Sequence, residues 1–269
     1  MKRAETLNAE KTVDHIHRFI HACLKQSGYQ SLVLGLSGGV DSALTAMICR
    51  NILPKDQVNC LFMPEKATPE IDRDHVELLV RQGDLNYRKR DISDLTAAFS
   101  EAAVISPDKI SLGNVKARLR MVLLYEYANT TRSLVCGTSN KSELMIGYFT
   151  KYGDGGVDLM PIGHLYKTQV WELATFLNLP KSIIEKKPSA GLFKGQTDEG
   201  ELKITYRVLD RILSGLELNR TDAAIAESSG ATFEDVARIR KMVALSEHKR
   251  RTAPFPQDTF PSPLNGDKR

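Results

Sequence analysis

The stretch Leu-Val-Leu-Gly-Leu-Ser-Gly-Gly-Val-Asp-Ser, from Leu32 to Ser42, decides the fold of this chain. Its first half is an apolar run typical of a buried strand, and Ala43–Arg50 continues it with a helical pattern. The Ser- and Gly-rich turn between them leads a strand directly into a helix N-terminus, where free backbone N–H groups and the helix dipole attract anions. We therefore expect a phosphate-binding loop at Ser37–Ser42.

Asp41 stands where the common G-x-x-x-x-G-K-[ST] phosphate loop carries a lysine. A carboxylate at this point repels phosphate unless a divalent cation lies between them, so Asp41 predicts Mg²⁺ bound together with phosphates. The hydroxyls of Ser37 and Ser42 can donate to the same phosphate oxygens. The alternative is an ordinary strand-turn-helix junction with a Ser or Asp cap.

The composition is that of a globular protein, with 269 residues, 42% hydrophobic residues and a formal net charge of +4. This mild charge suits anionic small molecules and gives no reason to expect a nucleic-acid partner. The four cysteines are scattered without a C-x-x-C pair, which favours reduced thiols and a cytoplasmic location. No signal peptide or membrane span is expected.

Short β-rich runs alternate with helical runs along most of the chain. Further strands are expected at Val58–Met63, Asn86–Ile92 and Ser133–Gly137. This alternation predicts an α/β fold, a doubly wound parallel sheet with helices on both faces. Ligands of such sheets bind at the carboxyl ends of the strands. Ile204–Glu247 predicts additional helices that stop at Gly215 and Gly230.

The loop after the last predicted strand, Gly137–Glu143, is the second polar segment expected at this edge of the sheet. Thr138 is placed to contact a nucleotide as the chain leaves the strand. Glu143, one turn into the next helix, is a candidate second Mg²⁺ ligand beside Asp41. The alternative is that Glu143 only complements the helix dipole.

Two later segments carry more chemistry than a connector needs. Phe149–Asp158 is rich in glycine and contains Lys151 and Asp154, which indicates a polar substrate loop. Lys167 places another cation where that loop returns. The long connection Lys186–Leu202 predicts a mobile lid.

Asn114–Asn129 has a strong helical pattern whose apolar stripe is interrupted by Arg118 and Arg120. It is either a core helix with snorkelling arginines or an oligomer contact with arginines aimed at a ligand, and the periodicity does not choose between them. We expect one domain over residues 1–253, followed by a flexible, proline-rich tail over residues 254–269.

The Ser37–Ser42 loop resembles the pyrophosphate-binding loop of the N-type ATP pyrophosphatases, which cleave ATP to AMP and pyrophosphate. Together with later blocks it resembles the ammonia-dependent NAD synthetases. These blocks are Gly137–Glu143, Tyr148–Asp158, Pro161–Gly163, Lys167, Pro188–Leu192 and Ser246–Arg250. The resemblance spans most of the chain from Leu32 to Arg251.

The resemblance implies a ligase of NAD biosynthesis. The nicotinate carboxylate of deamido-NAD would attack the α-phosphate of ATP and release pyrophosphate, and ammonia would then displace AMP to leave NAD. It also implies Mg²⁺ as a cofactor and a homodimer, with the apolar stripe of Asn114–Asn129 as a candidate contact surface. No amidohydrolase domain precedes the loop, so ammonia is expected to arrive free or from a separate glutaminase.

The family's site residues carry over to positions in this sequence. ATP would contact Gly35, Leu36, Ser37, Gly38, Gly39, Val40, Asp41, Ser42, Thr138, Lys167 and Ser189. Deamido-NAD would contact Arg118, Lys151, Asp158, His248 and Lys249. The catalytic residues would be Asp41 and Lys167 at the phosphates and Asp154 at the ammonium, with Mg²⁺ on Asp41 and Glu143. Ammonium must lose a proton before attack, so Asp154 serves as its base only with a raised pKa.

Two segments depart from the family pattern. Many bacterial members carry an Asp-His pair where this chain has Ser139-Asn140, and Met63–Lys66 differs in a way that leaves the adenine pocket unassigned. One alternative is another ATP pyrophosphatase, such as a tRNA thiolase or a GMP-synthetase-like subunit, although the cysteines lack an arrangement for sulfur transfer. The other is a non-catalytic nucleotide sensor, which would need the loop but not the carboxylates and lysine beside it.

Overall fold

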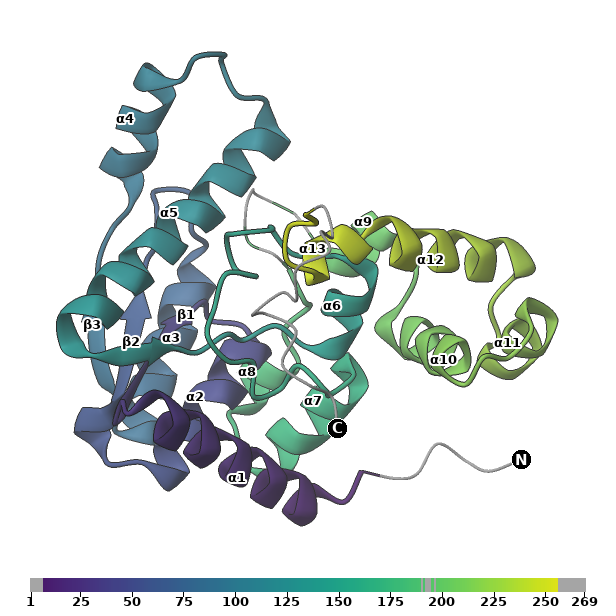
Figure 1. The fold of residues 1–269 in the computed structure, drawn as a ribbon, viewed down its shortest axis with the longest axis horizontal. Coiled ribbons are helices and arrows are strands. Elements are labelled where there is room, and N and C mark those ends of the chain that lie inside the picture. Colours follow the sequence, from purple (N-terminus) through teal and green to yellow (C-terminus); the bar gives the residue numbers. More distant parts are fainter. Residues whose placement is uncertain (1–6, 190, 192–194, 196, 256–269) are drawn as a thin grey trace.

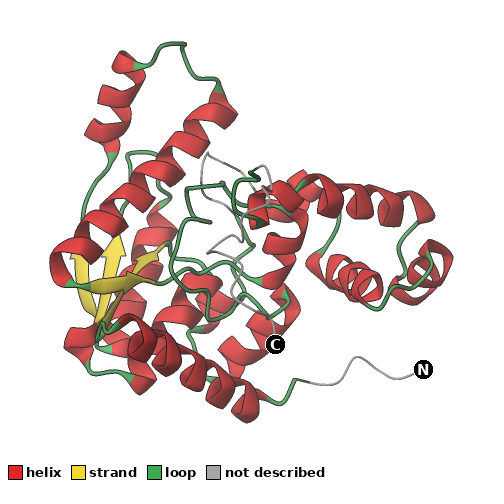
Figure 2. Ribbon diagram, in the orientation of Figure 1, coloured by secondary structure: helices red, strands yellow, loops and turns green. Residues whose placement is uncertain are grey.

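The computed structural model describes residues 7–189, 191, 195 and 197–255 of the chain. Its centre is a four-stranded, fully parallel sheet with the strand order β3-β2-β1-β4 (Figure 2). The strands are β1 (Ser31–Leu36), β2 (Val58–Phe62), β3 (Asn86–Lys89) and β4 (Ser133–Val135). A single parallel bridge between Cys136 and Leu159 extends the sheet beyond β4.

Helices follow and cover the strands (Figure 1). Those before β4 are α1 (Ala9–Ser27), α2 (Val40–Ile52), α3 (Glu70–Gly83), α4 (Ser93–Ala102) and α5 (Lys109–Thr131), with a short 3-10 turn at Lys55–Gln57. Those after β4 are α6 (Lys141–Ile146), α7 (Lys167–Phe176), α8 (Lys181–Ile184), α9 (Asp198–Leu202), α10 (Tyr206–Glu217), α11 (Asp222–Ser229), α12 (Phe233–Leu245) and α13 (Glu247–Arg250). None of the described helices is long and apolar enough to cross a membrane.

Strand β1 shows why both faces of the sheet are covered. Its side chains alternate between the faces, as the pleat of a strand requires. Leu32 and Leu34 belong to the large core with residues of α1, α2 and α7, whereas Val33 packs on the opposite face with residues of α5. All three are 0% exposed. The predicted doubly wound α/β fold is therefore confirmed.

Three predicted strands are shorter than expected, and β2 ends at Phe62 rather than Met63. Strand β3 ends at Lys89 rather than Ile92, although the backbone N–H of Arg90 still donates to Phe62, the last residue of β2, and that of Ile92 donates to Pro64 just beyond it. Strand β4 ends at Val135 rather than Gly137. The segments that follow β2 and β4 line the cavity described below, whereas residues 86–92 do not.

Helices α10, α11 and α12 project away from the sheet, on the opposite side of the molecule from α4 (Figure 1). They enclose a core of their own, and Trp171 of α7 packs against both this core and the central one. Gly230 ends α11 in a left-handed conformation, as predicted. The predicted stop at Gly215 is wrong: this residue lies inside α10, where a Cβ would come within 2.6 Å of the Ile225 side chain. Close helix packing, not termination, requires glycine there.

The predicted lid and tail fall partly outside the described residues. Within Lys186–Leu202 the structure describes residues 186–189, 191, 195 and 197–202, and of the tail it describes only residues 254 and 255. The mobility of both segments stays a prediction, as do the domain limits.

Candidate active site

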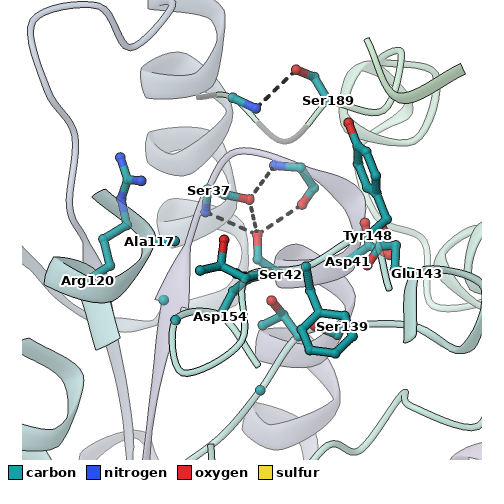
Figure 3. Close-up of a pocket in the computed structure, with 18 of the residues that line it drawn as sticks. Ser37, Asp41, Ser42, Ala117, Arg120, Ser139, Glu143, Tyr148, Asp154 and Ser189 are labelled. Atoms are coloured by element: carbon teal, nitrogen blue, oxygen red, sulfur yellow. Dashed lines mark hydrogen bonds between the residues drawn. The ribbon is translucent and has the colours of Figure 1, made fainter. Parts of the chain in front are cut away.

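A cavity of about 570 Å³ opens at the carboxyl ends of β1, β2 and β4 (Figure 3). This volume is within the range of small-molecule sites, about 300–1,000 Å³. The two polar loops predicted to meet, Ser37–Ser42 and Gly137–Glu143, both contribute to its lining, as do the loop around Asp154, helix α5 and Ser189. The crevice expected from the order of strands is present.

Hydrogen bonds within the Ser37–Ser42 loop fix its conformation, and they are drawn as dashed lines in Figure 3. The Ser42 hydroxyl accepts from the backbone N–H of Ser37 at 3.2 Å and lies 3.0 Å from the Ser37 hydroxyl, and it donates to the Gly39 carbonyl at 3.1 Å. Gly38 has a φ of 77°, and a Cβ there would lie 2.6 Å from the backbone oxygen of Asp72. Ser42 therefore shapes the loop, and glycine is required at position 38 by both conformation and space.

Lys167, the first residue of α7, places its ammonium group between the two predicted metal ligands. Its Nζ lies 2.5 Å from Oδ2 of Asp41 and 3.2 Å from Oε1 of Glu143. The lysine side chain is 2% exposed, and the carboxylates are 17% and 15% exposed. The three predicted residues thus form one ion cluster, in which two carboxylates share one ammonium.

Burial and charge act against each other in this cluster. Burial alone lowers the pKa of Lys167, but the charges of Asp41 and Glu143 outweigh it and raise that pKa above its usual value, so the ammonium stays protonated. Burial, supported by the charge of Asp41, raises the pKa of Glu143 to about 8 although Lys167 opposes the rise. The site therefore carries more carboxyl groups than one lysine can keep ionised, and an added cation would favour their ionised form.

These carboxylates fit a magnesium ion that is also bound by phosphates. Mg²⁺ prefers oxygen ligands and is commonly held by one or two carboxylates plus substrate phosphates. Asp41 and Glu143 supply two such groups. Among the described residues there is no group of three or more His, Cys, Asp or Glu side chains that could hold a metal by itself. The donor set matches an ion brought by a nucleotide rather than a closed protein cage.

Two residues of this centre were not assigned from the sequence. Asn140 caps α6 and donates to Asp41; its pattern, Asn followed three residues later by Glu, is the signature of a capping box and could have identified it. Asp198, at the start of α9, is 3% exposed and its Oδ2 accepts from the hydroxyl of Tyr206 at 2.9 Å. Its negative charge acts on Lys167. No local pattern links Asp198 to this site, because only the tertiary fold brings α9 there.

Asp154 lies in the cavity wall, where its carboxylate accepts from the backbone N–H of Thr150 at 2.9 Å (Figure 3). Asp154 is exposed to solvent in the cavity, although many protein atoms lie around its carboxylate. Burial raises the pKa of Asp154, while backbone hydrogen bonds and the charges of Lys249 and Arg120 oppose the rise. This direction is the one its predicted role requires.

Of the other predicted residues, Thr138, Ser189 and Lys249 line the cavity. The Lys249 ammonium donates to the backbone oxygens of Gly147 and Phe149 at 2.7 and 2.8 Å. Lys249 therefore also fixes the segment that leads to Asp154.

The remaining residues predicted to bind the dinucleotide do not line the cavity. Arg118 donates to the backbone oxygen of Lys151 at 3.2 Å, and Lys151 donates to that of His248 at 2.7 Å, so these three lie together. Asp158 accepts from the hydroxyl of Tyr125 and from the backbone N–H of Val135. In this structure its carboxylate joins the loop of residues 149–158 to β4.

Comparison with known proteins shows the family of this chain. The family model described as NAD synthase matches residues 12–253. An ammonia-dependent NAD⁺ synthetase of Methanosarcina mazei is 43% identical over 254 residues, covering 93% of this chain and 99% of that protein. Another, from Archaeoglobus fulgidus, is 46% identical over 249 residues, covering 92% and 97%.

Solved structures show the same similarity. An NMN synthetase from Francisella tularensis has a TM-score of 0.84 at 32% identity. An ammonia-dependent NAD synthetase from Campylobacter jejuni, in complex with a nitrate ion, has a TM-score of 0.80 at 32% identity. Each alignment covers 94% of this chain and all of the other chain.

Proposed function

The chain belongs to the NAD synthase family, and we propose that its cavity joins ammonia to the nicotinate carboxylate of deamido-NAD at the expense of ATP, giving NAD, AMP and pyrophosphate. The observation that carries this proposal is the Asp41–Lys167–Glu143 cluster beside a phosphate-binding loop. It supplies positive charge and cation ligands at the place where a triphosphate would be attacked. Neither a nucleotide sensor nor a bare strand-turn-helix junction needs such a cluster.

In the first step an oxygen of the nicotinate carboxylate attacks the α-phosphorus of ATP, and pyrophosphate leaves. A carboxylate must be activated because hydroxide is too poor a leaving group for direct displacement by ammonia. The attack brings an anion to a polyanion, so catalysis depends on fixed positive charge. Lys167 and the backbone N–H groups of the Ser37–Ser42 loop provide it. Mg²⁺, held by Asp41 and Glu143, would neutralise further charge on the phosphates when bound.

In the second step ammonia attacks the acyl carbon of the nicotinate adenylate, and AMP leaves. Ammonium has no free electron pair, so one proton must be removed before or during the attack. Asp154 is suited to accept it, because its raised pKa makes it a better base than an ordinary aspartate and its side chain faces the cavity. Lys249 lies near enough to stabilise the ionised form of Asp154.

The apolar side of the cavity suits the adenine ring of ATP. Leu36, Phe62, Met63 and Leu124 line it next to the phosphate-binding loop. Arg120 crosses this wall and donates to the backbone oxygen of Met63 at 3.0 Å. We assign adenine to this wall because flat aromatic ligands bind between apolar side chains near a few fixed polar groups.

The remote group of Arg118, Lys151 and His248 suits the rest of the dinucleotide, and it adjoins the face of α5 that we propose as a dimer contact. Val122, within the predicted stripe, is 55% exposed, and a subunit contact there would cover it. In such a homodimer the deamido-NAD site would lie near the subunit interface. A separate glutaminase as the ammonia source and a cytoplasmic location stay predictions from the sequence.

The test is to incubate the protein with ATP, Mg²⁺, an ammonium salt and deamido-NAD, and to identify the products by chromatography. We expect NAD, AMP and pyrophosphate in equal amounts. Formation of ADP, or of NAD without AMP, contradicts the mechanism. Because one structural relative is an NMN synthetase, nicotinate mononucleotide is the control substrate, and we expect a lower kcat/KM for it than for deamido-NAD.

A further inference from the structure

Asn140 makes two different hydrogen bonds with its side-chain amide, although it is 0% exposed. Its oxygen accepts from the backbone N–H of Glu143 at 3.1 Å, and its nitrogen donates to Oδ1 of Asp41 at 2.9 Å. A backbone N–H only donates and an ionised carboxylate only accepts, so a single orientation of the amide satisfies both partners. Asn140 thus joins the cap of α6 to the carboxylate of the phosphate-binding loop.

These contacts close a ring of four residues. Asp41 presents Oδ1 to Asn140 and Oδ2 to Lys167. Glu143 presents Oε1 to Lys167 at 3.2 Å and Oε2 to the backbone N–H of Asn140 at 3.4 Å. Each of the four carboxylate oxygens therefore has a donor, which fixes the direction in which each carboxylate points.

Asn140 is the one side chain of this ring that does not ionise. A neutral donor orients Asp41 without cancelling its charge, so the Asp41 carboxylate stays available to a cation. A lysine or arginine in its place would orient the carboxylate equally well but would neutralise it. The amide therefore serves a purpose beyond capping, since serine, threonine or aspartate would cap α6 equally well.

Resting on the proposed function, we propose that Asn140 is a positioning residue of the reaction, which fixes the Asp41 carboxylate in its working orientation and couples it to Glu143. It acts through Asp41, since the amide already has partners for its oxygen and one of its N–H groups. Its removal should disturb the chemical step and leave binding of the dinucleotide largely unchanged.

One variant pair separates positioning from capping. Asn140→Ser keeps an oxygen for the Glu143 N–H but is too short to reach Asp41. The matched control is Asn8→Ser, because Asn8 caps α1 with the same kind of bond, 3.0 Å to the Lys11 N–H, and does not line the cavity. We expect kcat to fall about tenfold or more in Asn140→Ser, with KM for deamido-NAD within about twofold, and both constants within about twofold in Asn8→Ser. A kcat for Asn140→Ser within about twofold of the parent overturns the proposal.

A polarity swap tests the contact itself, without substrates. Asn140→Asp places two carboxylates next to each other at positions 41 and 140. In the double variant Asp41→Asn/Asn140→Asp, the amide at position 41 can donate to the carboxylate at position 140, so the contact again has one donor and one acceptor. We expect the urea midpoint to fall in Asn140→Asp and to recover in the double variant, while turnover stays lost because the carboxylate has moved. Additive losses of stability, measured with both single variants, or turnover restored by the swap, contradict the proposal. The stability measurements of this cycle test the contact between Asn140 and Asp41 even if the parent protein makes no NAD. A parent that makes no NAD would refute only the proposed function.

Discussion

The ammonium nitrogen of Lys167 lies 2.5 Å from Oδ2 of Asp41, although 126 positions separate the two residues in the chain. Asp41 lies in the first turn of α2 and Lys167 begins α7, so the contact joins the loop after β1 to the helix that follows the loop of residues 149–158. Both side chains are mostly withdrawn from solvent. This ion pair lies at the centre of the site, and the first prediction concerns its removal.

Lys167→Met should destabilise the protein and abolish turnover. The substitution leaves Asp41 and Glu143 without their shared cation, and breaking a buried ion pair in this way costs about 3–5 kcal/mol. Urea unfolding at neutral pH measures the loss. The control is Lys55→Met, which removes an ion pair with Asp84 whose partners are 48% and 68% exposed, and it should cost less than about 1 kcal/mol. Equal losses of unfolding free energy in the two variants would show that the buried cluster stabilises the protein no more than an exposed ion pair does.

Stability of the metal-free protein should fall as pH rises from about 4.5 to about 8. The ordinary pKa of glutamate is 4.5, and in the folded protein that of Glu143 is raised to about 8 by burial. Between these values the folded state binds a proton that the unfolded state has released, so raising the pH favours unfolding. Glu143→Gln should make the slope of unfolding free energy against pH less negative in this window. An unchanged slope contradicts the assignment.

Asp154→Asn should block the second step and spare the first. The amide cannot accept a proton from ammonium, but the groups at the phosphates remain in place. Exchange of labelled pyrophosphate into ATP in the presence of deamido-NAD should therefore continue, while NAD formation falls by about 10²–10⁴-fold. In the parent, the rate at fixed total ammonium should rise with pH through the raised pKa of Asp154. Loss of exchange together with NAD formation would place Asp154 in the first step instead.

Val122→Glu should convert a homodimer into monomers. A buried charge at an apolar contact is costly, and Val122 lies on the exposed face of α5. Light scattering at micromolar concentration gives the mass directly. Phe233→Glu is the control, because Phe233 is 61% exposed on α12, away from α5 (Figure 1), and should leave the dimer intact. A parent that is already a monomer refutes the predicted assembly.

The fold and the centre of the site could be predicted because both have strong local signals. The apolar run ending in Ser37–Ser42 and the alternation of strands and helices specify a parallel sheet, whose topology then brings the loops after β1 and β4 together. Asp41 and Glu143 were identified in this way, Lys167 was identified from its position after the loop of residues 149–158 and from the family resemblance, and all three lie within one ion cluster. Their roles toward ATP and Mg²⁺ stay predictions.

Other features depend on tertiary contacts that have no local signal. Gly215 looks like a helix stop, yet it serves the packing of α10 against Ile225. Asp158 looks like a substrate ligand, but in this structure it bonds to Tyr125 and to the backbone of Val135. Asp198 lies near the cluster only because the tertiary fold brings α9 there. The sequence pattern shows which residue types are present, whereas their partners depend on how distant segments pack.

The most direct test of the central claim follows one oxygen atom. Deamido-NAD labelled with ¹⁸O in the nicotinate carboxylate is converted in the presence of ATP, Mg²⁺ and ammonium. The masses of AMP and pyrophosphate are then measured by mass spectrometry. If the carboxylate attacks the α-phosphorus, one carboxylate oxygen leaves with the phosphate, so the account predicts AMP that carries ¹⁸O and pyrophosphate that does not. Unlabelled AMP, or label in any phosphate other than that of AMP, would contradict it.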